Sequence, residues 1–219
     1  MGLFGFGKKK ELKEQPVAES VNDDQEMINR LCSHAGNIIA MLKAVLSGKN
    51  GTDLYIVTLY AAGLAGIACH EAVKALGEPM VEVGCANGKK YYMGDAVNKY
   101  LHENKYSVTG FACAITQMPQ SAVLTIVQRQ ASTIGTESFV VAGNMDPDDL
   151  YKNIKGCWDG IKNNMTLQYC KKPEEWPVLY GIVLQNIMKE AMNLAAKEAI
   201  FNTAVDVACA LSKMDQESL

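Results

Sequence analysis

An uncharged stretch of sixteen residues, Leu54–Cys69, limits the possible folds of this chain more than any other feature. Asp53 precedes the stretch and His70–Glu71 follows it. A helix that is apolar on every side must be buried, so other elements have to surround it. The stretch is shorter than the ~20 apolar residues that cross a bilayer, and no basic residue flanks it. We therefore expect the central helix of a soluble globule, with a short membrane span as the less favoured alternative.

The composition is that of an ordinary soluble globule. The 219 residues are 48% hydrophobic and 21% charged, which suits one compact domain or two small ones. The formal net charge is -3, whereas a nucleic-acid-binding surface normally carries a basic stripe. The few aromatic residues do not alternate with basic ones as platforms for base stacking would. We therefore expect no nucleic-acid partner.

The seven cysteines are expected to be reduced. Their number is odd, no Cys-x-x-Cys occurs, and most of them lie inside apolar runs. A disulfide framework needs pairs, and a zinc site needs closely spaced ligands. The sequence therefore predicts buried thiols in a cytoplasmic protein.

No metal or cofactor motif is found in the sequence. The three histidines, His34, His70 and His102, have no i, i+3 or i, i+4 partner of their own kind, and both Glu-x-x-His and His-Glu-x-x-His are absent. Glycine-rich nucleotide-binding patterns and the nucleophile elbow are absent as well. We expect no metal and no cofactor, with a metal site assembled from distant residues as the alternative.

Residues 1–21 are expected to form a flexible tail. They contain several glycines and no apolar period, and Lys8–Lys10 form a basic run. Leu3, Phe4 and Phe6 lie close to these lysines, so weak contact with an anionic membrane surface is an alternative to a plain soluble leader.

A first helix is predicted from about residue 23 to 47. Asn22 and Gln25 have the spacing of a capping box. Apolar residues then follow at steps of three and four, a seam that is typical of a helix packed along a partner helix. The seam consists of Ile28, Leu31, Ala35, Ile38, Leu42 and Val45. Ile28, Leu31, Ile38 and Leu42 are the candidate interaction residues.

A second helix, about 52–76, contains the uncharged stretch. Thr52 or Asp53 is expected to cap it, and Gly77 to end it. Alanines line one side at helical spacing, with Gly63 and Gly66 nearby. Small residues at this spacing predict that another helix approaches closely.

The remainder is predicted to be mostly helical. A hairpin is expected over residues 80–93, with Asn87–Gly88 in its turn, followed by a short helix to about 103. Helices are expected over 107–117 and 121–132, and a third strand over 139–141. Asp146 and Pro147 open a helix that Asn163–Asn164 end. Residues 177–211 form a long helix, continuous or broken in two, with Leu194 on its apolar face.

These elements predict a fold class. Residues 22–219 are expected to form a single mainly α, multi-helix globular domain with one small β-hairpin near 80–93. The alternative is an α+β fold with a small antiparallel sheet.

Few residues suggest a chemical role. Cys69 and His70 are neighbours, but adjacent helical residues point about 100° apart, so Cys69 would need His34 or His102 as a partner. A buried structural thiol is the favoured interpretation.

Arg129 is the sole positive charge between Lys105 and Lys152. Such an arginine pairs with a carboxylate, for which Glu137 is the candidate, or with an anionic ligand. A structural role is favoured. Tyr91 and Tyr92 belong either to a ligand surface or to the packing face of the hairpin.

Two functions follow as hypotheses. The first is a non-enzymatic cytoplasmic protein that acts by protein–protein interaction or homo-oligomerisation, with itself or another protein as partner. The second is an enzyme or small-molecule-binding protein with a pocket near Arg129, Tyr91 and the Cys69–His70 helix end. Candidate ligand-binding residues are Arg129, Tyr91, Tyr92 and His70.

Overall fold

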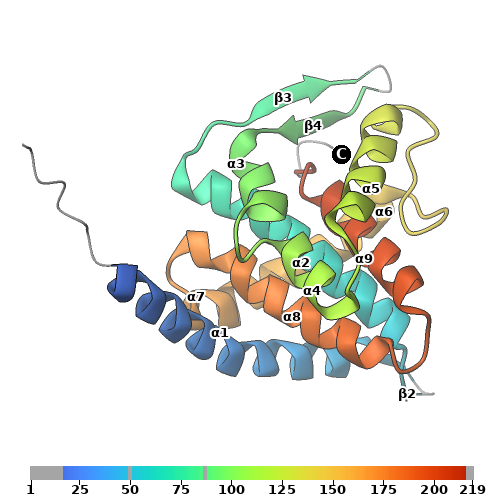
Figure 1. Cartoon of the computed structure of the whole chain (residues 1–219). Helices are drawn as coiled ribbons and strands as arrows, with labels where there is room; N and C mark the ends of the chain where they lie inside the picture. The colour runs from blue at the N-terminus through green and yellow to red at the C-terminus, as the bar shows by residue number, and fades with distance from the viewer. Residues whose placement is uncertain (1–16, 49–50, 86–87, 216–219) are drawn as a thin grey trace, which may run out of the picture.

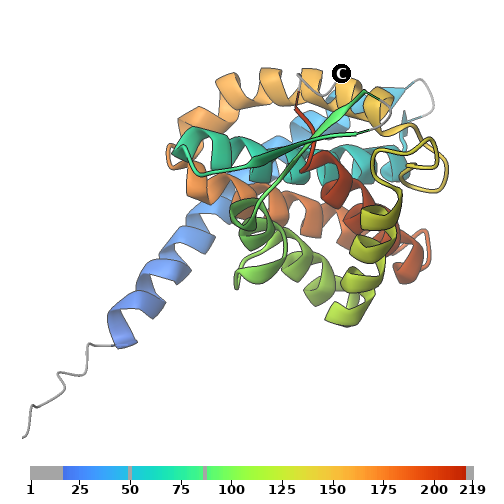
Figure 2. The same ribbon diagram turned by 90° about the horizontal axis from the view of Figure 1, so that it is seen from above.

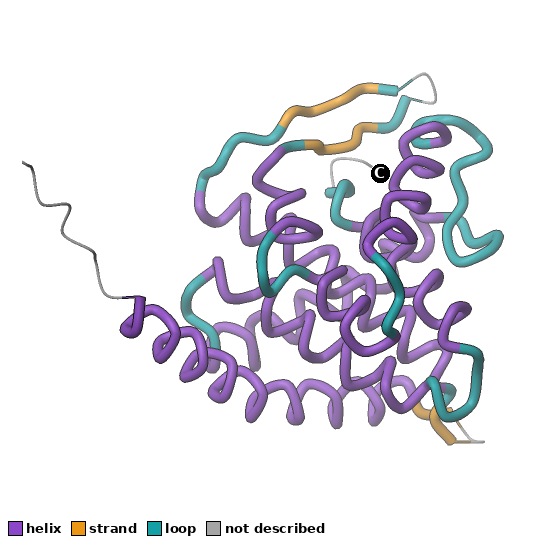
Figure 3. The backbone as a smooth tube through the Cα atoms, viewed as in Figure 1, coloured by secondary structure: helices purple, strands orange, loops and turns teal. Residues whose placement is uncertain are grey.

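The chain folds mainly into helices, with two small antiparallel sheets of two strands each (Figure 1 and Figure 3). The computed structural model describes residues 17–48, 51–85 and 88–215, with side chains from residue 23 onward. The predicted mainly α fold with a small hairpin is confirmed. The membrane-contact hypothesis for the tail concerns residues that lie outside those described, and it stays a prediction.

The helices and strands follow one another in this order: α1 (Val17–Leu46), β1 (Ser47–Gly48), β2 (Gly51–Thr52), α2 (Leu54–Leu76), β3 (Val81–Gly84), β4 (Lys90–Met93), α3 (Asp95–Asn98), the π-helix η1 (Lys99–Glu103), α4 (Val108–Thr116), α5 (Gln120–Thr133), α6 (Pro147–Ile161), the π-helix η2 (Lys162–Thr166), α7 (Leu167–Tyr169), the 3-10 helix η3 (Pro173–Glu175), α8 (Trp176–Ala191) and α9 (Lys197–Leu211).

Helix α2 occupies the centre of the fold, with α8, α9 and α6 around it (Figure 1 and Figure 2). The Asp53 carboxylate caps it by accepting from the backbone N–H of Tyr55 at 2.8 Å, and Gly77 ends it in the left-handed conformation at φ 67°. By length and composition α2 is able to cross a membrane, but 83% of its most apolar 18-residue window is buried inside the fold. The predicted central helix of a soluble-like globule is confirmed.

The small residues of α2 allow α9 to approach closely. A Cβ built on Gly66 would lie 2.3 Å from the carbonyl oxygen of Ala208, which is closer than real atoms come. Gly63 is similarly crowded by side chains of Ile154 in α6 and Leu211 in α9. The close packing that these glycines allow therefore offsets the low helix propensity of glycine.

The seam of α1 packs on α8 of the same chain. Leu31, Ala35, Ile38 and Leu42 are fully buried and Ile28 is half-buried, whereas Val45 is 62% exposed, so its predicted place in the seam is wrong. An ion pair between Lys43 and Glu190, 2.5 Å long, joins α1 to the end of α8. The partner helix that the seam predicts is therefore internal. The N-terminal half of α1 extends away from the body (Figure 2).

The hairpin β3–β4 forms in the predicted place. Its register pairs Val81 with Met93 and Gly84 with Lys90. The residues of its turn at 86–87 lie outside the described ranges. Tyr92 donates its backbone N–H to the carbonyl of Lys213 at 2.7 Å, so the hairpin is attached to the segment after α9. This contact supplies the support that a lone hairpin lacks in water.

Two predictions about helix ends are wrong. The capping box at Asn22 fails because α1 already begins at Val17, so Asn22 lies inside the helix. Asn163 and Asn164 do not stop α6, because the chain continues through η2 and α7. The side-chain amides of both residues donate to backbone carbonyls four residues earlier, and so compete with the backbone N–H groups for these acceptors. The helix takes the wider π form in this segment.

Two further predictions need correction. Residues 139–141 form no third strand among the described residues, and Val141 makes an isolated bridge to Met145 instead. The helix predicted over 177–211 takes the broken form, with a turn at 192–196 between α8 and α9, and Leu194 in that turn is 77% exposed rather than on an apolar face.

Replacing Gly66 by alanine tests the contact between α2 and α9. We expect Gly66→Ala to lower the free energy of unfolding by about 3 kcal/mol, because the added methyl group meets rigid backbone. Gly156→Ala in α6 is the matched control, since nothing lies within 4 Å of its Cβ position, and we expect it to raise stability by about 1 kcal/mol. Urea unfolding of the three proteins measures both values, and equal effects would contradict the close packing.

Candidate functional site

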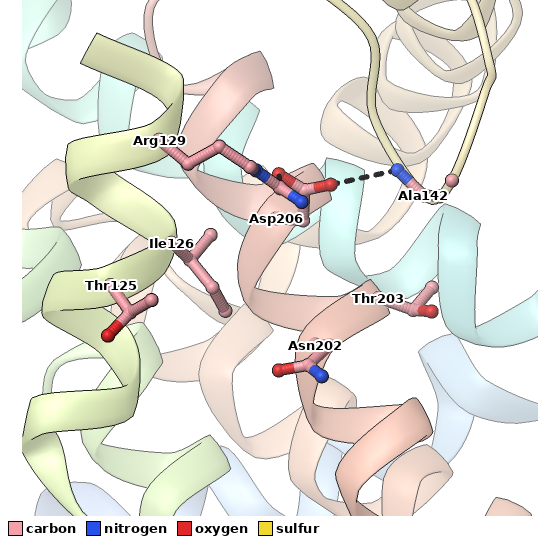
Figure 4. Close-up of a pocket in the computed structure, with 8 residues that line it drawn as sticks. Thr125, Ile126, Arg129, Ala142, Asn202, Thr203 and Asp206 are labelled. Atoms are coloured by element: carbon pink, nitrogen blue, oxygen red, sulfur yellow. Dashed lines mark hydrogen bonds and ion pairs between the residues drawn. The ribbon is translucent and has the colours of Figure 1, made fainter. Parts of the chain in front are cut away.

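A small hollow of about 260 Å³ lies between α5, α9 and the turn over residues 141–145 (Figure 4). Each helix contributes residues at positions i, i+1 and i+4, which share one face of a helix. The lining residues are Thr125, Ile126 and Arg129 from α5, Asn202, Thr203 and Asp206 from α9, and Ala142 and Gly143 from the turn.

The Asp206 carboxylate is the centre of this site. It is only 4% exposed, and both of its oxygens are engaged. Oδ1 accepts hydrogen bonds from the Arg129 guanidinium and, at 2.6 Å, from the side-chain amide of Gln130. Oδ2 accepts from the backbone N–H of Ala142 at 2.9 Å. A buried carboxylate needs such compensation because desolvation disfavours its charge.

The prediction that Glu137 pairs with Arg129 is wrong. The partner is Asp206, seventy-seven residues along the chain on α9. Glu137 borders another hollow, next to the start of α6. Proximity in sequence did not predict the partner of Arg129, because the turn after α5 carries Glu137 away from the face that presents Arg129.

The turn beside Asp206 has an unusual backbone. Ala142 has φ +47° and Gly143 has φ +92°, both in the left-handed region. This conformation costs a residue with a Cβ about 1–2 kcal/mol. The bond from Ala142 to Asp206 and the two backbone bonds between Val141 and Met145, of 3.0 and 2.9 Å, hold the turn in place.

The predicted ligand-binding residues do not converge on one pocket. Arg129 lines the hollow described above, whereas Tyr91 is 1% exposed and packs edge-on against Phe139. Tyr92 and His70 do come together, with ring centroids 5.5 Å apart in an edge-to-face contact. Tyr91 therefore belongs to the packing face of the hairpin, and the other two belong to a separate cluster.

His70 fastens the end of the chain to α2. Its ring is 1% exposed, with Nδ1 3.3 Å from the carbonyl oxygen of Ser212 and Nε2 3.5 Å from Oδ2 of Asp215. Lys74, one turn further along α2, donates to the same carboxylate oxygen at 2.6 Å. These contacts stabilise the segment after α9, so we assign His70 a structural role.

A thiol and an imidazole do meet, although the pair differs from the expected one. Cys209, rather than Cys69, lies against His102, with Sγ 3.9 Å from Nε2, and Thr109 holds Nδ1 at 3.3 Å. Burial raises the pKa of Cys209 to about 12 and lowers the pKa of His102 to about 4. Both groups are therefore uncharged at neutral pH, whereas a nucleophilic cysteine needs a thiolate.

The other predicted partners are also placed. Cys69 is fully buried, and burial raises the pKa of its thiol well above the ordinary range. His34 stacks on Tyr169, with ring centroids 4.4 Å apart on the surface of α1. Neither forms a reactive pair.

Within the ranges that the structure describes, no group of three or more histidine, cysteine or acidic side chains is placed to hold a metal ion. A scan against protein-family models finds no match, and searches of curated proteins and of solved structures find no significant one. The function therefore has to be argued from the geometry.

Sequence reasoning missed the part of the site that α9 and the turn supply. In the sequence, Asn202 and Asp206 follow Glu198 at steps of four with lysines nearby, a pattern typical of a solvated face, and Thr203 has no distinguishing signal. One signal was present: Asp206 is the sole charge in the run Ala204–Leu211, and a charge inside an apolar run needs a buried partner.

Replacing His102 by glutamine tests its buried, neutral state. The folded pKa of about 4 lies below the unfolded value near 6.5, so the unfolded chain binds the proton first as the pH falls. The stability that the neutral ring contributes is complete above pH 6.5 and is lost towards pH 4, by about 3 kcal/mol at most. Urea unfolding at pH 7 and pH 4.5 should therefore show a larger loss for the wild type than for His102→Gln. Equal losses would contradict the assignment.

Proposed function

We propose that this chain is a non-catalytic protein that acts by protein–protein contact through the outer face of α1. The observation that supports the proposal is an exposed helix face on which Lys43, already paired with Glu190 of α8, is the sole lysine, arginine or acidic residue between Cys32 and Ala44. Cys32, Gly36, Ala40 and Ala44 follow one another at steps of four along α1, and all four are exposed. The other exposed residues of this stretch, Ser33 and Asn37, are also uncharged.

Such a face is unusual for a helix in water, which normally turns charged residues outward. Nothing lies within 4 Å of the Cβ position of Gly36, so packing inside the chain does not require a glycine there. In the middle of an exposed helix a glycine costs about 1 kcal/mol relative to alanine. A second helix that packs against Gly36 in an assembly would explain the glycine, because the absence of a side chain lets the two helices approach closely.

The core of the same chain contains a close parallel. Small residues on α2 allow α9 to approach so closely that a methyl group at Gly66 would collide with backbone. By the same geometry, the row from Cys32 to Ala44 has the shape that a second helix fits.

The first partner to consider is a second copy of the chain. Two such rows placed antiparallel about a two-fold axis set small residues against small residues, with no like charges opposed along the stretch. The buried seam residues Leu31, Ile38 and Leu42, with the half-buried Ile28, support this arrangement from below, because they fix α1 to α8 and keep the outer face rigid.

Other features agree with a non-catalytic, intracellular role. The thiols of Cys69 and Cys209 are held protonated by burial. All seven cysteines are free, which supports the cytoplasmic location expected from the sequence.

Sedimentation over a concentration series tests the proposal. We expect the wild type to dimerise, and Gly36→Leu to weaken the association at least about tenfold because leucine keeps the second helix away. Gly156→Leu in α6 is the matched control, with an exposed glycine and open space around it, and we expect it to dimerise like the wild type. Leucine favours helix over glycine, so both variants should fold.

Two outcomes count against the proposal. One is a wild type that stays monomeric at every accessible concentration and also retains no partner protein in a pull-down whose binding is lost in Gly36→Leu. The other is a dimer that both leucine variants form equally well, which would place the interface elsewhere.

A further inference from the structure

We infer that the hollow beside Arg129 binds a small monocarboxylate, whose carboxylate group lies on the edge of the guanidinium that Asp206 leaves unused. The hollow is formed by α5, α9 and the turn over 141–145, so the inference goes beyond the contact surface proposed on α1 and does not depend on it.

The inference starts from the donors of Arg129. A guanidinium carries five N–H donors in a planar fork. Within the described part of the chain, the contact of Arg129 is made by Nη2, to Oδ1 of Asp206, while the side chain remains 55% exposed. The rest of the fork is open to the hollow and to solvent, and its geometry matches the two oxygens of a carboxylate.

The other polar side chains of the hollow can donate as well as accept. Asn202 and Thr203 present an amide and a hydroxyl from α9 (Figure 4). The one carboxylate present, Asp206, already accepts from Arg129, Gln130 and the N–H of Ala142. The N–H groups of Arg129 that Asp206 does not use can only donate, so a ligand that pairs with them must supply acceptor oxygens.

The charge of the hollow limits the ligand to a single negative charge. Asp206 neutralises Arg129, which leaves no net positive charge among the lining residues. A dianion such as phosphate would place two negative charges beside a cation that Asp206 already neutralises. A monocarboxylate carries one negative charge and is held mainly by hydrogen bonds from the guanidinium.

The size and the apolar wall limit the ligand further. A volume of about 260 Å³ is below the range of about 300–1,000 Å³ that is typical of pockets for drug-sized molecules. Ile126 and Ala142 supply an apolar wall. A carboxylate with a short aliphatic chain satisfies both conditions.

The site is also organised before the ligand arrives. Asp206 fixes the guanidinium of Arg129 and, through the N–H of Ala142, the turn that closes one side of the hollow. Groups that are already held in place lose less entropy on binding. The left-handed backbone at Ala142 and Gly143 is maintained by the same contacts.

Titration with butyrate, followed by amide NMR spectra of the whole chain, tests the inference. We expect saturable shifts confined to residues 125–130, 141–145 and 202–206. Butyramide has the same shape without the charge, and inorganic phosphate has the charge without the apolar chain. Both should bind at least about tenfold more weakly than butyrate.

Three variants make the test specific. Arg129→Lys retains a positive charge for Asp206 but removes the planar fork, so butyrate affinity should fall about tenfold. Thr203→Val removes a donor from the hollow and should weaken binding several-fold. Thr133→Val, on the same helix, is the matched control, because Thr133 does not line the hollow and its hydroxyl donates to the carbonyl of Arg129 at 3.1 Å, so its loss should leave the affinity unchanged.

Any of three results would overturn the inference. Butyrate shifts that do not saturate, or that spread over the whole chain, would mean that no site exists. Equal binding of butyrate and butyramide would remove the carboxylate from the recognition. Arg129→Lys with wild-type affinity, or equal effects of Thr203→Val and Thr133→Val, would place the ligand elsewhere.

Discussion

The contact between α2 and α9 determines where the other elements lie. Gly66 allows the two backbones to approach more closely than any side chain would permit. Because α2 is apolar all round, α8 and α6 must cover its remaining sides, and α1 then packs outside α8. The ends of α2 are fixed as firmly as its middle, with Asp53 capping the start and His70 holding the segment that follows α9.

The two candidate surfaces arise from opposite departures from ordinary helix chemistry. The outer face of α1 carries a single lysine, which is already paired, where solvent-facing positions usually carry several charges. Helix α9 has a charge, Asp206, where an apolar residue would be ordinary. The first departure leaves a helix ready for contact with another helix, and the second orders an arginine at the edge of a hollow. Each feature costs stability locally, and each is supported by the packing described above.

Much of the architecture could be predicted because it follows from local patterns. The apolar period of α1, the uncharged run of α2, the hairpin near 80–93 and the cap at Asp146 all depend on residues close in sequence. The candidate site depends on residues far apart. Nothing near Arg129 identifies Asp206 as its partner, and the backbone angle at Ala142 is unusual for alanine. The sequence likewise leaves open whether residues 177–211 form one helix or two, because helix propensity does not distinguish a continuous helix from two helices that tertiary packing separates.

The way in which Asp206 holds the turn has a consequence for how freely this chain can vary. Its second oxygen accepts from a main-chain N–H, not from a side chain, so the interaction survives replacement of the residue that supplies it. The backbone geometry at position 142 suits glycine or asparagine at least as well as alanine, although the Ala142 side chain also packs against the core and lines the hollow. Homologous chains that retain the aspartate are therefore free to change the tip of this turn, and with it the shape of the opening beside Arg129.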